Sequence, residues 1–227
     1  MNKLSLVLSG ALVCLLGCSD PNKQTPASAT AASDQAAAPA ATAAPAGATA
    51  QVGKPAPDFK LKDTEGNEIG LAQHRGKVVV LEWFNPECPF VKRSHTKGSL
   101  KGLAPTLADK GVVWLSINSG APGKQGAGAE KSKAGAEALG VKNPILLDES
   151  GAVGKLYGAT NTPHLFVVDP DGVLAYAGAI DNSPDAEGES PEGGKLVNYV
   201  TEAIAAVTEK RPVSVPQTKA YGCSVKY

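Results

Sequence analysis

A single cysteine at the start of an expected helix is the residue of this sequence best suited to chemistry. Residues 83–95 read WFNPECPFVKRSH, so Cys88 stands between an apolar run and Pro89. Proline suits the first position of a helix, whose free backbone N–H groups and positive dipole end would then face the sulfur. Such surroundings lower the pKa of a thiol and favour the reactive thiolate. Cys88 is therefore predicted to be a nucleophile, with an inert buried thiol as the alternative.

The partner that would resolve a bond made at Cys88 is not next to it. Such a cysteine usually belongs to a Cys-x-x-Cys pair, but Val91 occupies the second position. Cys223, in a tail of turn-forming residues, is the candidate that folds back and resolves a mixed disulfide or sulfenic acid. The long separation is no obstacle, because closure entropy grows slowly with loop length. A permanent disulfide that ties down the tail and a buried free thiol are the alternatives.

Three charged residues near Cys88 could tune its chemistry. Glu82 lies within the apolar run KVVVLEWF. There its pKa would be raised, and it could pass protons to or from a sulfur leaving group. A glutamate that faces outward or pairs with a lysine would have no such role. Lys92 and Arg93 lie one turn after Cys88, where they either add to the positive field or form a solvated helix face, the usual outcome for charges at helical spacing.

The N-terminus reads as a lipoprotein signal, residues 1–17. Lys3 precedes a short apolar run, and LLGC at 15–18 resembles the lipobox of bacterial lipoproteins. The resemblance implies that Cys18 is acylated and holds the chain on a membrane. Ser19 then favours the outer over the inner membrane, with the protein facing the periplasm. An ordinary secretory signal is the alternative.

Composition predicts one globular domain on a tether. The chain has 227 residues, 42% of them hydrophobic, and a formal net charge of zero, which gives no sign of a nucleic-acid partner. Residues 18–51 are rich in Ala, Pro, Thr and Ser and have little to bury, so they are predicted to be a disordered tether. An Ala-rich helix there would be broken repeatedly by proline. Residues 52–227 form the predicted domain, which keeps only Cys88 and Cys223.

The hydrophobic pattern of residues 52–227 predicts an α/β domain with a central mixed β-sheet flanked by helices. Continuous apolar runs indicate buried parallel strands, and the turn at 169–172 indicates an antiparallel hairpin. An N-terminal β-hairpin extends the domain. The predicted strands are 59–61, 68–70, 77–84, 111–118, 144–148 and a pair within 162–178; the helices are 89–110, interrupted at Gly98 and Pro105, then 129–140, 151–158 and 194–209.

This order of elements resembles the thioredoxin-like fold over 52–227. Three segments carry a closer resemblance to the single-cysteine, peroxiredoxin-like branch of the AhpC/TSA-type redoxin family: NPECPF, TNTPHLFVVDPDG and the tail RPVSVPQTKAYGCSVKY. The resemblance implies that the Thr162–Pro163 bond is cis and that its backbone faces the thiol, offering an edge to an extended peptide. A plain strand-entry proline is the alternative.

The same resemblance assigns further site residues. Thr162, Pro163, Pro89 and Phe90 are the candidates for contact with substrate, and Glu82 stands where thioredoxins often carry a buried acid. The expected activity is a thiol-based oxidoreductase that exchanges disulfides with protein or small-molecule thiols at the cell envelope. No cofactor is expected.

Peroxide reduction is the second hypothesis, and it fits the sequence less well. Peroxiredoxins typically carry Pro and Thr seven and three residues before the reactive cysteine, with an arginine near the later strand. Leu81, Asn85 and Pro163 occupy these places. This departure weakens the expectation of efficient peroxidase activity.

A copper carrier and a redox-inert binding domain complete the hypotheses. Cys88, Cys223 and His164 could offer two soft thiolates and an imidazole to Cu(I). However, copper carriers of this fold place a second cysteine where Lys92 stands. His74, His95 and His164 have no spacing that marks a metal-ligand pair, so no metal site is predicted. The glycine-rich stretch 119–130 lacks the Gly-Lys-Ser/Thr ending of a phosphate-binding loop.

Overall fold

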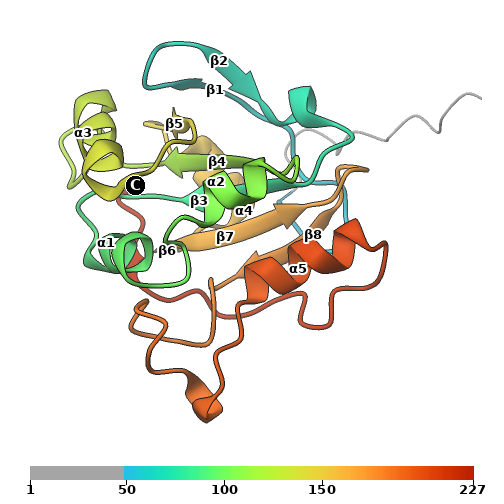
Figure 1. Ribbon diagram of the computed structural model, residues 1–227. Helices are drawn as coiled ribbons and strands as arrows, with labels where there is room; N and C mark the ends of the chain where they lie inside the picture. Colours follow the sequence, from blue (N-terminus) through green and yellow to red (C-terminus); the bar gives the residue numbers. More distant parts are fainter. Residues whose placement is uncertain (1–48) are drawn as a thin grey trace, which may run out of the picture. The chain divides into compact units, whose positions relative to one another are not determined.

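The computed structural model describes residues 49–227, and a seven-stranded sheet forms their centre (Figure 1). Its strand order is β2-β1-β5-β4-β3-β7-β8. The strands are β1 (Lys60–Asp63), β2 (Glu68–Gly70), β3 (Val79–Trp83), β4 (Val113–Asn118), β5 (Ile145–Leu147), β7 (His164–Val168) and β8 (Leu174–Gly178). The predicted lipidation site Cys18, the predicted signal and most of the predicted tether lie outside the described residues.

The sheet is mixed, as the sequence pattern predicts. β3, β4 and β5 are parallel, whereas β7 pairs antiparallel with β3 and with β8. Every residue of β3 and β7 is buried, because helices cover both faces of the sheet, and this explains why these strands are mostly apolar. The predicted N-terminal hairpin is β1–β2, which joins the sheet by antiparallel pairing of β1 with β5.

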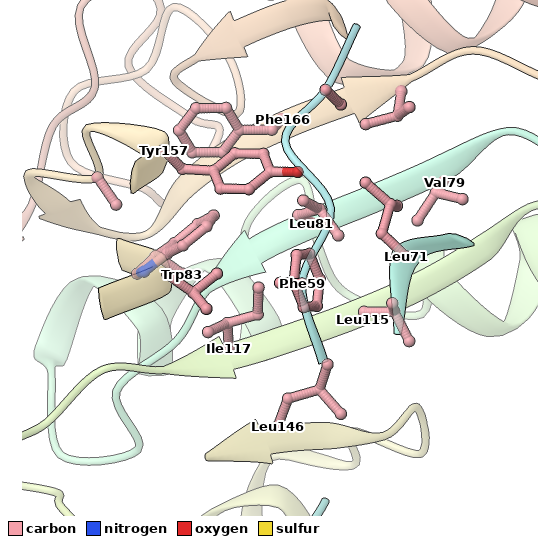
Figure 2. Packing of buried hydrophobic residues seen from close by; sticks show 14 of the residues in the cluster. Phe59, Leu71, Val79, Leu81, Trp83, Leu115, Ile117, Leu146, Tyr157 and Phe166 are labelled. Atoms are coloured by element: carbon pink, nitrogen blue, oxygen red, sulfur yellow. The ribbon is translucent and has the colours of Figure 1, made fainter. Parts of the chain in front are cut away.

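Alternate residues of each strand face two separate cores. One core, on the face that carries Leu81 and Trp83, packs against α4 (Ala152–Tyr157) and the 3-10 helix η1 (Leu71–His74) (Figure 2). In that core Trp83 contacts Tyr157 and Phe166, with ring centroids 5.5 and 5.0 Å apart. The other core, which includes Val80, packs against α2 (Leu103–Ala108) and α5 (Tyr199–Thr208). A smaller cluster joins α1 (Pro89–Thr96) and α3 (Ala129–Leu139) around Cys88.

The predicted helix 89–110 is two helices. α1 ends at Thr96 and α2 begins at Leu103, so the predicted interruption at Gly98 is confirmed. The predicted interruption at Pro105 is wrong, because this proline is the third residue of α2. A backbone N–H in the first turn has no partner within the helix, so proline costs little there.

The last helix begins later than predicted. α5 starts at Tyr199, after Asn198 as its N-cap, whose side chain accepts a hydrogen bond from the backbone N–H of Thr201. Gly194 has a φ of 75°, which is incompatible with a right-handed helix start. It belongs instead to a short 3-10 turn, η2 (Glu192–Gly194), within the loop that precedes α5.

The C-terminal tail adds a strand that the hydrophobic pattern did not reveal. β9 (Cys223–Ser224) pairs antiparallel with β6 (Asn161–Thr162), directly before Pro163. Figure 1 shows the tail, in red, reaching β6. Together with helices on both faces of the mixed sheet, these features define a thioredoxin-like fold. Within residues 49–227, none of the helices has the length and apolar character needed to cross a bilayer.

Candidate active site

Cys88 is the N-cap of α1, as predicted, and Pro89 is the first residue of that helix. The Cys88 side chain is completely buried, so its sulfur is closed off from solvent in this conformation. Burial alone would raise the pKa of this thiol. Hydrogen bonds from the Cys223 thiol and from the backbone N–H of Val91 outweigh that effect, and the pKa of Cys88 lies below its ordinary value.

The Thr162–Pro163 bond is cis, as the resemblance implies, and Thr162 contacts Cys88. The Sγ of Cys88 lies 3.1 Å from the backbone oxygen of Thr162, to which the thiol donates a hydrogen bond. Thr162 and Pro163 are both buried. The strand β6 and the start of α1 therefore form the two sides of the site.

Cys223 completes the site from the far end of the chain. Strand pairing places Cys223 opposite Thr162, and its Sγ lies 2.6 Å from the Sγ of Cys88. Both cysteines are free thiols. Burial, the hydrogen bond to Cys88 and the negative charge of the Cys88 thiolate raise the pKa of Cys223 to about 11. The two thiols are thus adjacent but differ in acidity, and Cys88 is the more acidic of the pair.

Phe90 contacts the tail and also packs against the cluster that contains Cys88. Its ring lies 6.4 Å from the ring of Tyr221 and 4.6 Å below the guanidinium of Arg93. Arg93 Nε donates to the backbone oxygen of Asp185, 2.9 Å away, and Lys92 is exposed. These two cations therefore form the outer face of α1.

Glu82 is a buried carboxylate, and the alternatives of an outward-facing or lysine-paired side chain are wrong. One carboxylate oxygen lies 2.7 Å from Nε2 of His95. The other accepts from Trp114 Nε1 at 2.9 Å and from Ser116 Oγ at 3.2 Å. Glu82 is completely buried and His95 is 8% exposed. The pair therefore links β3 to α1, and its hydrogen bonds connect it to Cys88 only through that helix.

Sequence reasoning missed the roles of His95, Tyr221 and the short strand β9. A signal for His95 exists, because Cys88, Val91 and His95 are spaced three and four residues apart, which places them on one helix face. A glutamate in a buried strand also requires a partner. Tyr221 and β9 carry no such signal, since two residues are too few to show a strand period.

The structure does not assemble a copper site. Within residues 49–227 there is no group of three or more His, Cys, Asp or Glu side chains arranged to hold a metal ion. His164 stacks on Phe166 at 4.5 Å, and its Nδ1 accepts from the backbone N–H of Thr160 at 3.3 Å. Burial lowers the pKa of His164 to about 4. This imidazole is a core residue, as its lack of motif spacing predicts.

The residues at peroxiredoxin positions have structural roles. Asn85 accepts from the backbone N–H of Glu87 at 2.9 Å and donates to the backbone oxygen of Gln125 at 3.1 Å, which shapes the turn before Cys88. Leu81 lies in the hydrophobic core.

A thioredoxin-like domain with a helix-capping cysteine against a cis-proline strand is a redoxin-type thiol protein. Residues 52–177, more than half of the chain, match the AhpC/TSA family, and the chain belongs to that family.

Curated proteins and solved structures both include relatives of this chain. The thiol-disulfide oxidoreductase ResA of Geobacillus thermodenitrificans is 35% identical over 121 residues, which cover 53% of this chain and 65% of that protein. ResA of Geobacillus kaustophilus is 33% identical over 121 residues, which again cover 53% of this chain and 65% of that protein. The chain thus spans about 65% of the length of these relatives.

Solved structures cover more of the chain. An uncharacterized conserved protein from Geobacillus kaustophilus has 33% identity and a TM-score of 0.66, covering 78% of this chain and 92% of that one. A hypothetical protein from Sinorhizobium meliloti has 29% identity and a TM-score of 0.65, covering 79% and 96%. Neither description states an activity.

Proposed function

We propose that the protein is a thiol-disulfide oxidoreductase in which Cys88 is the nucleophile and Cys223 the resolving thiol. The observation that carries this proposal is the sulfur pair: a helix-capping Cys88 with a lowered pKa, 2.6 Å from a second free thiol on the tail. Similarity to oxidoreductases named ResA supports the same activity. Protein thiols and disulfides are the proposed substrates.

The proposed reaction transfers two electrons in two exchange steps. The Cys88 thiolate attacks one sulfur of a client disulfide, forming a mixed disulfide and releasing the other client sulfur as a thiolate. Cys223 then loses its proton and attacks the Sγ of Cys88. The client leaves as a dithiol, reduced by two electrons, and the chain holds a Cys88–Cys223 disulfide. The reverse sequence of steps oxidises a client dithiol.

The pKa of Cys223 gives a physical reason for the order of the two exchange steps. Two of the causes that raise this pKa, the hydrogen bond with Cys88 and the negative charge on Cys88, require that Cys88 is not bonded to a client. When Cys88 enters a mixed disulfide its charge is lost, and the pKa of Cys223 falls. The resolving thiol therefore becomes a better nucleophile only after a client has been captured.

Trapping of the mixed disulfide tests the proposal. Cys223→Ser should accumulate clients bound to Cys88 in a form that a reductant releases, whereas Cys88→Ser should trap none. The wild-type chain, in contrast, should cycle between two free thiols and one internal disulfide on thiol titration. If Cys223→Ser traps no client and the wild-type thiols do not cycle, the proposed activity is wrong.

For Glu82 we propose a positioning role that acts through His95. The carboxylate holds His95, which lies on α1 two turns after Cys88, and so fixes the helix start that activates the sulfur. Glu82→Gln should shift the pH profile of the exchange rate. Ser116→Ala removes a hydrogen bond to the same carboxylate without touching α1, and it should leave that profile in place.

We also propose that the protein is an envelope lipoprotein, anchored through Cys18 and more favourably sorted to the outer membrane. The LLGC stretch and the Ala/Pro-rich segment 18–51 support this placement. An oxidising compartment would suit a chain with two cycling thiols. Cys18→Ser should move the protein from the membrane pellet to the soluble fraction; retention in the pellet would contradict the anchor.

A further inference from the structure

The tail occupies the edge that an extended substrate would need. β9 pairs with β6 so that Cys223 lies opposite Thr162 and Ser224 opposite Asn161. Two further hydrogen bonds extend this pairing: the backbone N–H of Val225 donates to the oxygen of Thr160 at 3.0 Å, and Asn161 Nδ2 donates to the oxygen of Gly222 at 3.0 Å. Main-chain pairing of this kind is how an extended peptide is held on a sheet edge, largely independent of its side chains.

The position before the cysteine accepts only glycine. Gly222 has a φ of 108°, and a Cβ there would lie 2.3 Å from the backbone oxygen of Thr162. That oxygen also receives the hydrogen bond from Cys88, so it cannot move aside without disturbing the nucleophile. The close approach of strand to strand next to the sulfur therefore selects against any side chain at this position.

Two aromatic subsites flank the cysteine. Tyr221, two residues before Cys223, packs on Phe90 and donates its hydroxyl to Asp181 Oδ1 at 2.8 Å. Tyr227, four residues after it, lies against Gly151 and Gly154 at the start of α4. Its hydroxyl donates to the oxygen of Ala159 at 2.7 Å. The ring of Tyr221 packs on an aromatic side chain and that of Tyr227 on glycine backbone, and each subsite offers one oxygen acceptor to a tyrosine hydroxyl.

We propose that this edge and its subsites bind an extended client segment in which glycine directly precedes the reactive cysteine and aromatic residues occupy the two flanking subsites. The tail is the built-in ligand of the same groove, and client and tail bind it in turn. This inference rests on the proposed thiol exchange and names the class of polypeptide that takes part in it.

The tail and a client cannot pair with β6 at the same time, and this alternation explains how the buried Cys88 reaches a substrate. The tail must leave β6 before a client strand can pair there, and it must return for Cys223 to attack Cys88. Resolution of the mixed disulfide is therefore a strand exchange: as the Cys88–Cys223 bond forms and the client sulfur leaves, the tail replaces the client on the same edge. The effective concentration of a tethered tail favours this displacement.

A peptide without a thiol tests the groove apart from the reaction. The probe is a fluorescent synthetic octapeptide with the sequence of residues 220–227 and a serine in place of the cysteine. Its binding to the reduced full chain is measured by anisotropy for the wild type and for variants that weaken the tail, Tyr221→Ala and Tyr227→Ala. Release of the tail should raise the apparent affinity about tenfold or more, because the competent fraction of the protein increases.

Two controls make the outcome specific. Val215→Ala changes an exposed tail residue, 40% accessible, outside the groove, and it should bind the peptide as the wild type does. A second peptide with alanine at the glycine position should bind the Tyr227→Ala variant about tenfold or more weakly, since its Cβ meets the strand. Equal affinity for wild type and both tyrosine variants, or equal affinity for the two peptides, would overturn the inference.

The two proposals fail separately. If the peptide binds as described but Cys223→Ser traps no client, the groove is a binding site and the exchange activity is wrong. If trapping succeeds but the peptide pattern fails, clients reach Cys88 by another surface. Far-ultraviolet circular dichroism of each variant shows whether a lost signal reflects binding or unfolding.

Discussion

At the level of single residues, the asymmetry between two adjacent sulfurs follows from what each one faces. Cys88 caps a helix whose Val91 N–H points toward it, whereas Cys223 lies on a strand and faces the thiolate itself. Burial raises the pKa of both thiols, so it does not distinguish them. The hydrogen bonds at each sulfur do, because they lower the pKa of Cys88 and raise that of Cys223, which suits Cys88 to the attacking role that we propose.

Removing the thiol donor should weaken the acidity of Cys88. In Cys223→Ala the hydrogen bond to the Cys88 thiolate is lost, so the pKa of Cys88 should rise. At any fixed pH below that pKa a smaller fraction of Cys88 is then ionised, and its rate of attack on a disulfide should fall. Cys223→Ser keeps a donor and should raise the pKa less. The measurement is the ultraviolet absorbance of the thiolate as a function of pH. An unchanged or lower pKa in Cys223→Ala would contradict the assignment.

His164 should make the fold sensitive to mild acid. Burial lowers its folded pKa to about 4 from the ordinary value of 6.5. Between these values the unfolded chain binds more protons, so stability falls as pH decreases through this range, by about 3 kcal/mol in all. In His164→Gln the loss of unfolding free energy between neutral pH and pH ~4 should be smaller by about this amount. Denaturant titrations at several pH values test this, and equal losses would refute it.

Which site residues could be predicted depends on how local their evidence is. The roles of Cys88 and Pro89 are predicted from the few residues around them, and that of Pro163 from a family resemblance carried by a short segment. The contact between Cys88 and Cys223 joins positions 135 residues apart, so the sequence left three readings of it open. The Glu82–His95 pair required knowing that α1 lies over β3, which periodicity alone does not give.

At the level of elements, local sequence signals predicted most strands and helices. They did not predict the conformation of segments that lack a hydrophobic period. The loop between β8 and α5 is shaped by side chains that bond to backbone: Asn182 to the oxygens of Glu192 and Lys195, and Asp185 to the N–H of Glu187. Such contacts leave no hydrophobic pattern. The start of α5 was missed for this reason, although its N-cap Asn198 is a recognisable signal.

The pairing of β9 with β6 should depend on the absence of a side chain at Gly222. In Gly222→Ala the new Cβ would meet the backbone of Thr162, so the tail should detach and expose Cys88. The alkylation rate of Cys88 in reduced protein, followed by mass spectrometry, should rise about tenfold or more. The sulfur is protected only while the tail is paired with β6, so a detached tail leaves it accessible.

Gly193→Ala is the matched control for that change. Gly193 also has a positive φ, 74°, but a Cβ there meets nothing within 4 Å. It carries the same kind of backbone strain, about 1 kcal/mol, without the collision at β6. Its Cys88 should alkylate at the wild-type rate. If both variants react alike, strain in general and not the strand contact controls access to the sulfur.

At the level of the whole molecule, the tail ties the last elements of the chain to the first. Thr218 bonds to Ala177 of β8, Cys223 meets Cys88 at the start of α1, and the oxygen of Lys226 accepts from the N–H of Ala121 after β4. A disulfide between Cys88 and Cys223 would turn this set of weak contacts into a covalent loop. The redox state of two sulfurs then changes the stability of the domain as well as access to the site.

Oxidation should therefore stabilise the domain against unfolding. Cross-linking positions 135 residues apart restricts the unfolded chain, an effect of about 5 kcal/mol in the chain-entropy account. The lowered pKa of Cys88 stabilises the reduced form and offsets part of this effect, so we expect a net gain in unfolding free energy on oxidation that is smaller than the chain-entropy figure. Urea titrations of oxidised and reduced wild type measure it, and Cys223→Ser should show no redox dependence. An oxidised form no more stable than the reduced one would mean that the native fold strains the bridge by as much as it restricts the chain.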